Sequence, residues 1–408
     1  MAIEQAVLSP QVCIAGGGPA GVVLSLLLAR KGMRVTLLES QRDFDRAFRG
    51  DTLHASSLEI LDQIGLAERA LALSSSRVTA FRIESGGHEY TVAELSAMKG
   101  KYPFVALVPQ VRLLNMLVEQ ASAYPGFNVL MGATVTGLVR EGGRVTGVTF
   151  SHEGQTHSLA ADLVVGADGR QSSVREAAGM ELVRNAAPMD VVWFQVPMQG
   201  ANAGDDAAII RFGAGTMLVI FSRDGYWQVG YVILKGDYRE VRKKGIDAFR
   251  AELIRMVPSM AEGFNLLKDW SACAILSVVT GRVTKWYQDG LLLIGDAAHV
   301  MSPVGGIGIN YAINDAAAAA NALLPALQGG AIGIEHLEAV QRRRELPVKF
   351  IQFFQAMVQQ RVIAAGLKSD KPFTPPLPLR IVSSLRPLRA RAARIMAYGL
   401  RPERLDSP

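Results

Sequence analysis

Cysteine is scarce in this sequence: Cys13 and Cys273 are the only two among 408 residues, and they form no C-x-x-C pair. The missing pair argues against a redox disulfide, and two thiols within apolar runs favour a reducing, cytoplasmic compartment. No apolar stretch approaches the roughly twenty residues that a membrane-spanning helix needs. The first ten residues lack the basic start and apolar core of a signal peptide. Histidine and carboxylate residues do not recur at metal-ligand spacing, so no metal site is expected.

Acidic residues do not balance the basic ones: the net charge is +6 and the isoelectric point is about 9.3. No basic helix interleaved with stacking aromatic residues follows from the sequence, so nucleic acid is not an expected partner. Much of the excess lies between Arg380 and Arg404, where arginines punctuate apolar residues. Such a tail can make a peripheral membrane contact, although a helix packed on its own domain with a basic outer face is the favoured alternative.

A glycine-rich turn follows the first apolar run, residues 11–15. A helix is expected to follow the turn, and a second strand over residues 34–38 ends in Glu39. A carboxylate in this position accepts hydrogen bonds from a ribose hydroxyl and repels a 2′-phosphate. The sequence therefore predicts a dinucleotide site. Its glycines have the G-x-G-x-x-G spacing, at Gly16, Gly18 and Gly21.

A second glycine-rich segment begins after the apolar run of residues 291–294, which places Asp296 at a strand end. A helix is expected to begin near Asn310. The carboxylate can accept hydrogen bonds from sugar hydroxyls, and free amides at a helix start can face electron-rich oxygens. We therefore expect a docking surface for a polyhydroxylated, partly anionic cofactor. Its other members are Gly295, Pro303, Gly306, Gly308 and Ile309.

A third segment is a strand-like run over residues 161–167 that ends in Asp168, Gly169 and Arg170, with Arg175 shortly after. Gly169 permits a tight turn, Asp168 can hold backbone amides, and the arginines are cations near the position expected for a phosphate. A plain strand-to-helix turn with solvated arginines is the alternative explanation.

In their order and spacing, these three segments resemble the fingerprints of single-component flavin-dependent monooxygenases, the aromatic hydroxylase family typified by para-hydroxybenzoate hydroxylase. The resemblance implies FAD, with NADH or NADPH as a transient co-substrate. It also implies hydroxylation of an aromatic or conjugated compound through a flavin C4a-hydroperoxide formed with O2. Chemistry centred on the flavin leaves the protein to bind, orient and exclude water.

The resemblance also implies site roles. Glu39 would bind the adenosine ribose, Asp296 the ribitol or pyrophosphate, and Asp168 both FAD and the nicotinamide. The backbone of residues 306–310 would face the isoalloxazine. Ile307 departs from the Gln that many members carry. Three further residues match FAD-contacting positions, namely Arg49, Gln110 and Arg112.

We predict an α/β protein with a Rossmann-type, glutathione reductase-like FAD-binding domain, an antiparallel β-sheet substrate lobe and a helical C-terminal tail. The FAD-binding domain is expected to be discontinuous. Its segments are residues 1–75, 100–183 and 281–340, the substrate domain comprises residues 76–99 and 184–280, and the helical region comprises residues 341–408. The sequence leaves monomer and homodimer both open.

Substrate contacts are predicted from strand alternation alone. Trp193 and Gln195 share one face of a strand, as do Tyr226 and Gln228, and these four are candidate substrate-binding residues. No catalytic side chain is identified, but Tyr226, Gln228 and His54 are candidates, the last as a proton relay. His299 is expected to support the turn around Asp296. Arg211 and Arg223 can bind a substrate carboxylate, although a surface role is favoured for both.

Two other functions remain open at this stage. A flavin-dependent reductase of the geranylgeranyl reductase type has the same cofactor fold and would saturate a double bond without consuming O2. A non-catalytic flavin-binding module would hold flavin that NAD(P)H does not reduce.

Overall fold

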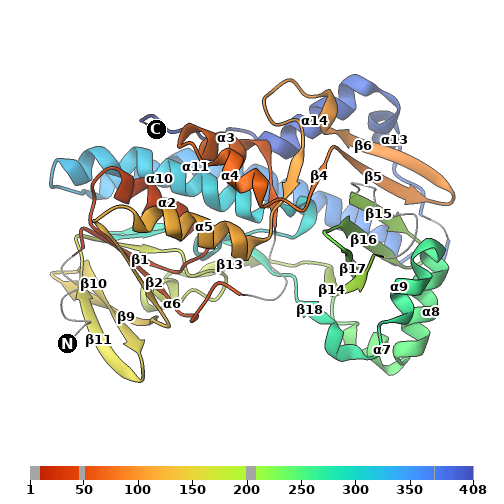
Figure 1. Cartoon of the computed structure of the whole chain (residues 1–408), viewed down its shortest axis with the longest axis horizontal. Helices are drawn as coiled ribbons and strands as arrows, with labels where there is room; N and C mark the ends of the chain where they lie inside the picture. Colours follow the sequence, from red (N-terminus) through yellow and green to blue (C-terminus); the bar gives the residue numbers. More distant parts are fainter. Residues whose placement is uncertain (1–9, 46–50, 199–207, 372, 408) are drawn as a thin grey trace.

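The computed structural model describes residues 10–45, 51–198, 208–371 and 373–407, and it has a mixed α/β architecture (Figure 1). A six-stranded sheet has the order β20-β21-β12-β1-β2-β8. Five of its strands are parallel, and β20 pairs antiparallel with β21. The strands are β1 (Val12–Ala15), β2 (Val35–Glu39), β8 (Phe127–Met131), β12 (Leu163–Gly166), β20 (Tyr287–Gln288) and β21 (Leu291–Leu293).

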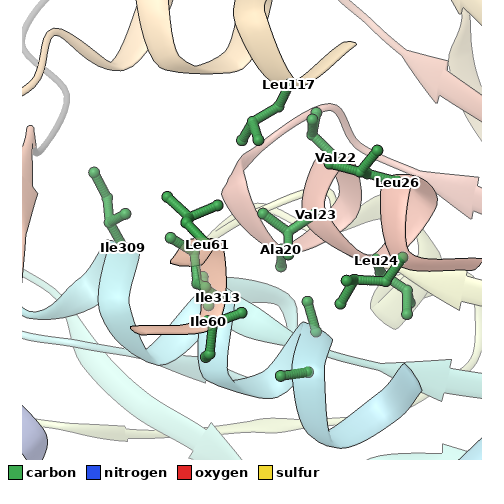
Figure 2. Close-up of a cluster of buried hydrophobic side chains, with 14 of the residues drawn as sticks. Ala20, Val22, Val23, Leu24, Leu26, Ile60, Leu61, Leu117, Ile309 and Ile313 are labelled. Atoms are coloured by element: carbon green, nitrogen blue, oxygen red, sulfur yellow. The ribbon is translucent and has the colours of Figure 1, made fainter. Parts of the chain in front are cut away.

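Both faces of this sheet are covered, which explains why its strands are continuously apolar. On one face pack α2 (Pro19–Arg30), α5 (Gln110–Ser122) and α10 (Gly308–Gln328). Figure 2 shows α2 side chains meeting those of α5, α10 and α3 (Ala55–Gln63) in one cluster. The other face contacts a three-stranded sheet. Its strands are β9 (Thr134–Glu141), β10 (Arg144–His152) and β11 (Gln155–Ala160).

A seven-stranded sheet builds the other end of the molecule in Figure 1, in the order β18-β14-β17-β16-β15-β5-β6. Helices α8 (Ile246–Met256) and α9 (Ala261–Asn265) cover one face. The predicted antiparallel sheet needs a correction, since β15 pairs with β5 in parallel. The strands are β5 (Ala80–Ser85), β6 (His88–Glu94), β14 (Met189–Pro197), β15 (Ala208–Phe212), β16 (Met217–Ser222), β17 (Tyr226–Leu234) and β18 (Ala274–Leu276).

Several predicted segment boundaries fall inside structural elements. The boundary after residue 340 cuts α11 (Ile334–Val358), and the boundary after residue 183 cuts β13 (Leu182–Asn185). β4 (Ser76–Val78) pairs with β7 (Val105–Leu107) and not with the seven-stranded sheet. β7 also pairs with β3 (Thr52–Leu53), which gives a separate three-stranded sheet. The remaining short sheet is β13-β19-β22, with β19 (Thr280–Val283) and β22 (His299–Val300).

Helices make up most of the described C-terminal region, and the last of them ends at Tyr398. Helices α13 (Leu377–Ser384) and α14 (Arg386–Tyr398) contact each other, and both pack on β6. Arg389 pairs with Glu94 of β6 at 2.9 Å. In the four ranges that the structure covers, no helix combines the length and apolarity needed to cross a bilayer.

Candidate functional site

The sequence motifs follow four parallel strands and lie at one edge of the six-stranded sheet. β1 leads into Gly16, β2 ends at Glu39, β12 leads into Asp168 and β21 leads into Asp296. Because the carboxyl ends of parallel strands share an edge, these groups converge there. The Gly17 amide donates to Glu39 Oε2 at 2.6 Å, and Arg170 Nε lies 3.8 Å from Asp296 Oδ2.

Two glycines of the first motif are required by close backbone approach. Gly16 has φ +104°, and a Cβ there would lie 2.5 Å from the Ala167 carbonyl oxygen. A Cβ on Gly21 would lie 2.0 Å from the Gly16 carbonyl oxygen. Any side chain at either position would therefore displace the turn from the strand edge.

Gly18 and Gly308 instead face open space. A Cβ on Gly18 would find its nearest neighbour at 3.9 Å, and a Cβ on Gly308 would find no described atom within 4 Å. These glycines stand at the starts of α2 and α10, and neither N-cap residue caps its helix with a side chain. Two helix starts with open approaches, beside the buried carboxylate of Glu39, fit an extended dinucleotide with a pyrophosphate. The residues present therefore fit FAD.

Asp168 is bonded within its own turn. It accepts hydrogen bonds from Ser172 Oγ, from Ser173 Oγ at 3.1 Å and from the Val174 amide at 3.1 Å. Arg175 is buried and donates to the carbonyl oxygens of Ala297 at 3.0 Å and Arg170 at 2.8 Å. The expectation of a phosphate-binding or solvated Arg175 is therefore wrong, because its guanidinium joins the Asp168 turn to the Asp296 turn.

A buried charge network supports the Asp296 turn from behind. Asp315 Oδ2 accepts from the Gly295 amide at 3.0 Å and lies 2.6 Å from His299 Nε2, while Asp315 Oδ1 accepts from Arg344 Nε at 2.8 Å. Burial alone would raise the pKa of Asp315, but His299 and Arg344 outweigh that effect and lower the pKa. The prediction that His299 supports this turn is confirmed. Neither Asp315 nor Arg344 was singled out in the sequence, because their partners are distant in the chain.

The C-terminal segment extends this network. Glu403 is buried, lies 2.6 Å from Arg343 Nε and 3.6 Å from Arg344 Nη1, and its amide donates to Asn314 Oδ1 at 2.9 Å. Leu405 exchanges two backbone hydrogen bonds with the Gln63 side chain. The segment thus packs onto α3 and α10, the helices that also flank the glycine-rich loop.

The loop of residues 303–310 is joined to the segment that begins at β3. Thr52 Oγ1 donates to the Gly306 carbonyl oxygen. Asn310 Oδ1 accepts from the His54 amide at 2.8 Å and from Ser57 Oγ at 2.8 Å. The Asn310 side chain is therefore engaged within the protein, and Ile309 packs into the core (Figure 2). At Ile309 and Asn310, the backbone groups and not the side chains are therefore available to a cofactor.

The other cofactor candidates are placed as follows. Pro303 begins the turn that carries Gly306, Ile307 is buried beneath that turn, and Gln110 is the first residue of α5. Arg112 is exposed in the first turn of α5. Arg49 lies outside the described residues.

His54 is buried between the 303–310 loop and α14. Its Nδ1 lies 2.9 Å from the Met396 carbonyl oxygen. Burial lowers its pKa from 6.5 to about 4, because desolvation of the imidazolium outweighs the favourable backbone contacts of Met396 and Gly305. The ring is therefore neutral at neutral pH.

This shift predicts a pH-dependent stability. The folded pKa lies below that of the unfolded chain, so acid protonates the unfolded state first, and the free energy of unfolding falls between pH 6.5 and about 4. In the wild type, this histidine accounts for a fall of up to about 3 kcal/mol in the free energy of unfolding as the pH drops. His54→Asn, which keeps a donor toward Met396, should not show that part of the fall. Urea unfolding at pH 7.5, 6 and 5 measures it. Parallel pH curves for the variant and the wild type would contradict this assignment.

One face of the seven-stranded sheet carries the predicted substrate residues. Gln195 pairs opposite Gln228 and Trp193 opposite Gly230, so their side chains share a face. Gln195 Nε2 donates to Gln228 Oε1 at 3.3 Å. Phe221, which sequence reasoning missed, lies beside Gln228 on this face and stacks on Trp193 with ring centroids 6.5 Å apart. Tyr226 opens β17 on the same face, and Val304 of the glycine-rich loop packs against the apolar residues there.

The two arginines of this sheet differ in position. Arg211 Nε binds Glu84 Oε2 at 2.6 Å, and Arg211 Nη1 donates to the Met256 carbonyl oxygen of α8, on the helix-covered face. Arg223 is buried on the opposite face and pairs with Asp51 at 2.7 Å. The favoured surface role for Arg223 is therefore wrong. No group of His, Cys, Asp and Glu in the described ranges has the arrangement of a metal site.

The sequence matches a family model described as FAD binding domain over residues 9–353. A 6-methylpretetramide 4-monooxygenase from Streptomyces rimosus is 35% identical over 357 residues, which span 87% of this chain and 85% of that relative. These two matches concern the whole region that contains the three motifs.

Solved structures share the fold. PqsL from Pseudomonas aeruginosa, in complex with 2-aminobenzoylacetate, superposes with a TM-score of 0.75 at 21% identity, over 88% of this chain and 98% of that one. OxyS anhydrotetracycline hydroxylase from Streptomyces rimosus gives a TM-score of 0.73 at 20% identity, over 96% of this chain and 76% of that one.

Proposed function

This chain belongs to the family of FAD-binding aromatic monooxygenases, and from that premise we propose that it hydroxylates a flat, multi-ring phenol or a related conjugated compound. It is an FAD-dependent enzyme that uses NAD(P)H and O2. The observation that carries the substrate class is the sheet face with Trp193, Phe221 and a pair of glutamine side chains, turned toward the 303–310 loop. Relatives that act on 6-methylpretetramide and anhydrotetracycline support a large planar substrate.

We propose that FAD lies along the carboxyl edge of the six-stranded sheet, in a Rossmann-type, glutathione reductase-like domain. Gly18 leaves room for the pyrophosphate, Glu39 accepts from the adenosine ribose, and Asp296 accepts from the ribitol. Asp168 and the backbone of the 303–310 loop complete the site. On the family resemblance we also propose that Arg49, Gln110 and Arg112 contact FAD.

When bound, the flavin supplies the redox and oxygen chemistry. The chain's own residues position the substrate. Trp193 and Phe221 contact the ring system, the glutamine pair offers hydrogen bonds at its edge, and the apolar side chains around Val304 exclude water. A relay role for His54 stays a prediction, and since burial lowers its pKa and opposes its protonation, such a relay would have to return to the neutral ring at once.

Four finer predictions are also proposed, namely the substrate lobe, the location, the membrane contact and the oligomeric state. We propose that residues 76–99 and 184–280 form most of the substrate lobe, with β4 excluded because it pairs with β7. A cytoplasmic location rests on the two free cysteines. The exposed arginines and apolar residues of α13 and α14 keep a peripheral membrane contact open, and both monomer and homodimer stay predictions.

Anaerobic stopped-flow mixing of the holoenzyme with NADH or NADPH, across a panel of multi-ring phenols, tests the function. We expect faster flavin reduction with a suitable ligand. When the reduced enzyme is then mixed with isotopically labelled O2, the product should carry one atom of the label. Saturation of a double bond without O2 consumption would identify a reductase. Flavin that neither nucleotide reduces, with every ligand tried, would identify a non-catalytic binding module.

A further inference from the structure

Arg223 is a buried cation where the seven-stranded sheet meets the β3-β7-β4 sheet. Its side chain is 3% exposed, and it follows β16 in the turn that leads to β17 (Figure 1). Buried arginines are nearly always paired. Here Nη2 lies 2.7 Å from Asp51 Oδ2, and Asp51 immediately precedes Thr52, which is bonded to the Gly306 carbonyl oxygen. The guanidinium therefore lies between the aromatic sheet face and the glycine-rich loop.

Strand alternation puts Arg223 on the same face as Phe221, and its Cζ lies 5.4 Å from the Phe221 ring centroid. Gln228 lies opposite Phe221 in the sheet, so the predicted substrate face and this cation are continuous. Arg211, in the same sheet, bonds the α8 carbonyl of Met256 on the other face. Arg223 is thus the arginine of this pair that a substrate on the aromatic face can reach.

One of the three guanidinium nitrogens has no acceptor in the part of the chain that the structure describes. Nη2 is paired with Asp51, and Nη1 approaches the Ser222 carbonyl oxygen at 3.4 Å. Nε is buried and has no hydrogen-bond partner among the residues that the structure describes. A buried N–H without an acceptor costs about 1–3 kcal/mol, so an acceptor supplied by a ligand would remove that cost.

The number of available donors decides which anion fits. A carboxylate is best recognised by two parallel N–H groups of one guanidinium. Both terminal nitrogens of Arg223 are already engaged, Nη2 by Asp51 and Nη1 by the Ser222 carbonyl oxygen, so Nε is the nitrogen left without an acceptor among the described residues. A single charged oxygen on a ring, as in a phenolate or enolate, is matched by one charge-assisted hydrogen bond.

We propose that Arg223 is a specificity residue of the substrate site and binds an acidic phenol or enol of the substrate as its anion. This role rests on the proposed function and names the substrate class more narrowly. Asp51 acts as a positioning residue, because it holds the guanidinium against Phe221 and leaves Nε toward the ligand.

Isothermal titration of the FAD-loaded enzyme with 2-hydroxyanthraquinone, 2-methoxyanthraquinone and anthraquinone-2-carboxylate tests this proposal, at a pH where the hydroxyl probe is ionised. The ionised hydroxyl probe should bind the wild type about tenfold to a hundredfold more tightly than its methyl ether. Arg223→Gln should remove that preference. Arg211→Gln breaks an ion pair on the other face and should keep it.

The outcomes separate this inference from the proposed function. Wild-type preference in Arg223→Gln, or a carboxylate probe that binds best, would overturn the role of Arg223 and leave the multi-ring substrate class standing. Failure of all three probes to bind the wild type would contradict the substrate class and the inference together. If Arg223→Gln retains no FAD, the titration is repeated with Arg223→Lys, which keeps the positive charge but lacks the Nε donor. An undiminished preference in that variant would overturn the proposal.

Discussion

Gly21→Ala is expected to yield little folded protein and almost no bound FAD. A methyl group there would lie 2.0 Å from the Gly16 carbonyl oxygen, which belongs to backbone and not to a movable side chain. Forcing extra atoms into such a contact costs about 1–3 kcal/mol or more, a large part of the 5–15 kcal/mol that stabilises a typical protein. Expression yield, flavin absorbance and urea unfolding measure the effect.

Gly18→Ala is the matched comparison, because it adds the same methyl group in the same motif. Gly18 has φ −77° and ψ 179°, which alanine adopts, and the nearest atom to its Cβ would be 3.9 Å away. This variant should fold, yet its methyl group should hold the pyrophosphate away from the helix start. Loss of one or two charge-assisted hydrogen bonds predicts FAD affinity weaker by about tenfold to a hundredfold. Wild-type FAD affinity in Gly18→Ala would place the cofactor elsewhere.

Asp315→Asn is expected to destabilise the protein by about 3–5 kcal/mol, the usual effect of breaking a buried ion pair. The amide cannot balance the Arg344 charge, and its NH2 group would face another donor, since Asp315 accepts from Arg344, His299 and the Gly295 amide. The variant should also lose FAD, because the Gly295 amide orients the turn that carries Asp296. Urea unfolding and the flavin-to-protein absorbance ratio measure both effects.

Asp289→Asn is the control for this change. Asp289 pairs with Arg144 at the surface, where its side chain is 49% exposed, and such a pair contributes about 0–1 kcal/mol. The double variant Asp315→Leu/Arg344→Met should recover part of the lost stability, because it removes both charges. Equal unfolding curves for Asp315→Asn and the wild type would show that the buried network does not support the turn.

Local patterns predicted the strands and helices around the three motifs well. Strand, glycine turn and helix follow one another in β1 and α2, Glu39 ends β2, and the helix expected near Asn310 begins at Gly308. These features depend on neighbours in the sequence, namely on apolar period, backbone freedom and strand ends. The family itself followed from the same three motifs, and the comparisons confirm it.

Features that depend on distant partners were not predictable in this way. Arg223 was expected at the surface because a charged residue in a turn normally lies there. No local pattern around it predicts the ion pair with Asp51, which is far away in the sequence. Arg175 was expected near a phosphate or in solvent, because its carbonyl acceptor, Ala297, lies in the turn after β21, 122 residues away in the sequence. The parallel pairing of β15 with β5 likewise depends on which edge is free once the hairpins have formed.

The interleaving of the two large sheets along the chain limits how this enzyme can be recombined with its relatives. β5 and β6 precede α5 in the sequence, whereas β14 to β18 follow β12, yet all seven strands share one sheet. A chimera with a single crossover between them would set β15 against a β5 from another parent. Exchange of the substrate-facing sheet as a unit therefore needs two inserts with four junctions. The register of the parallel pair β5 and β15 must be kept in any such exchange.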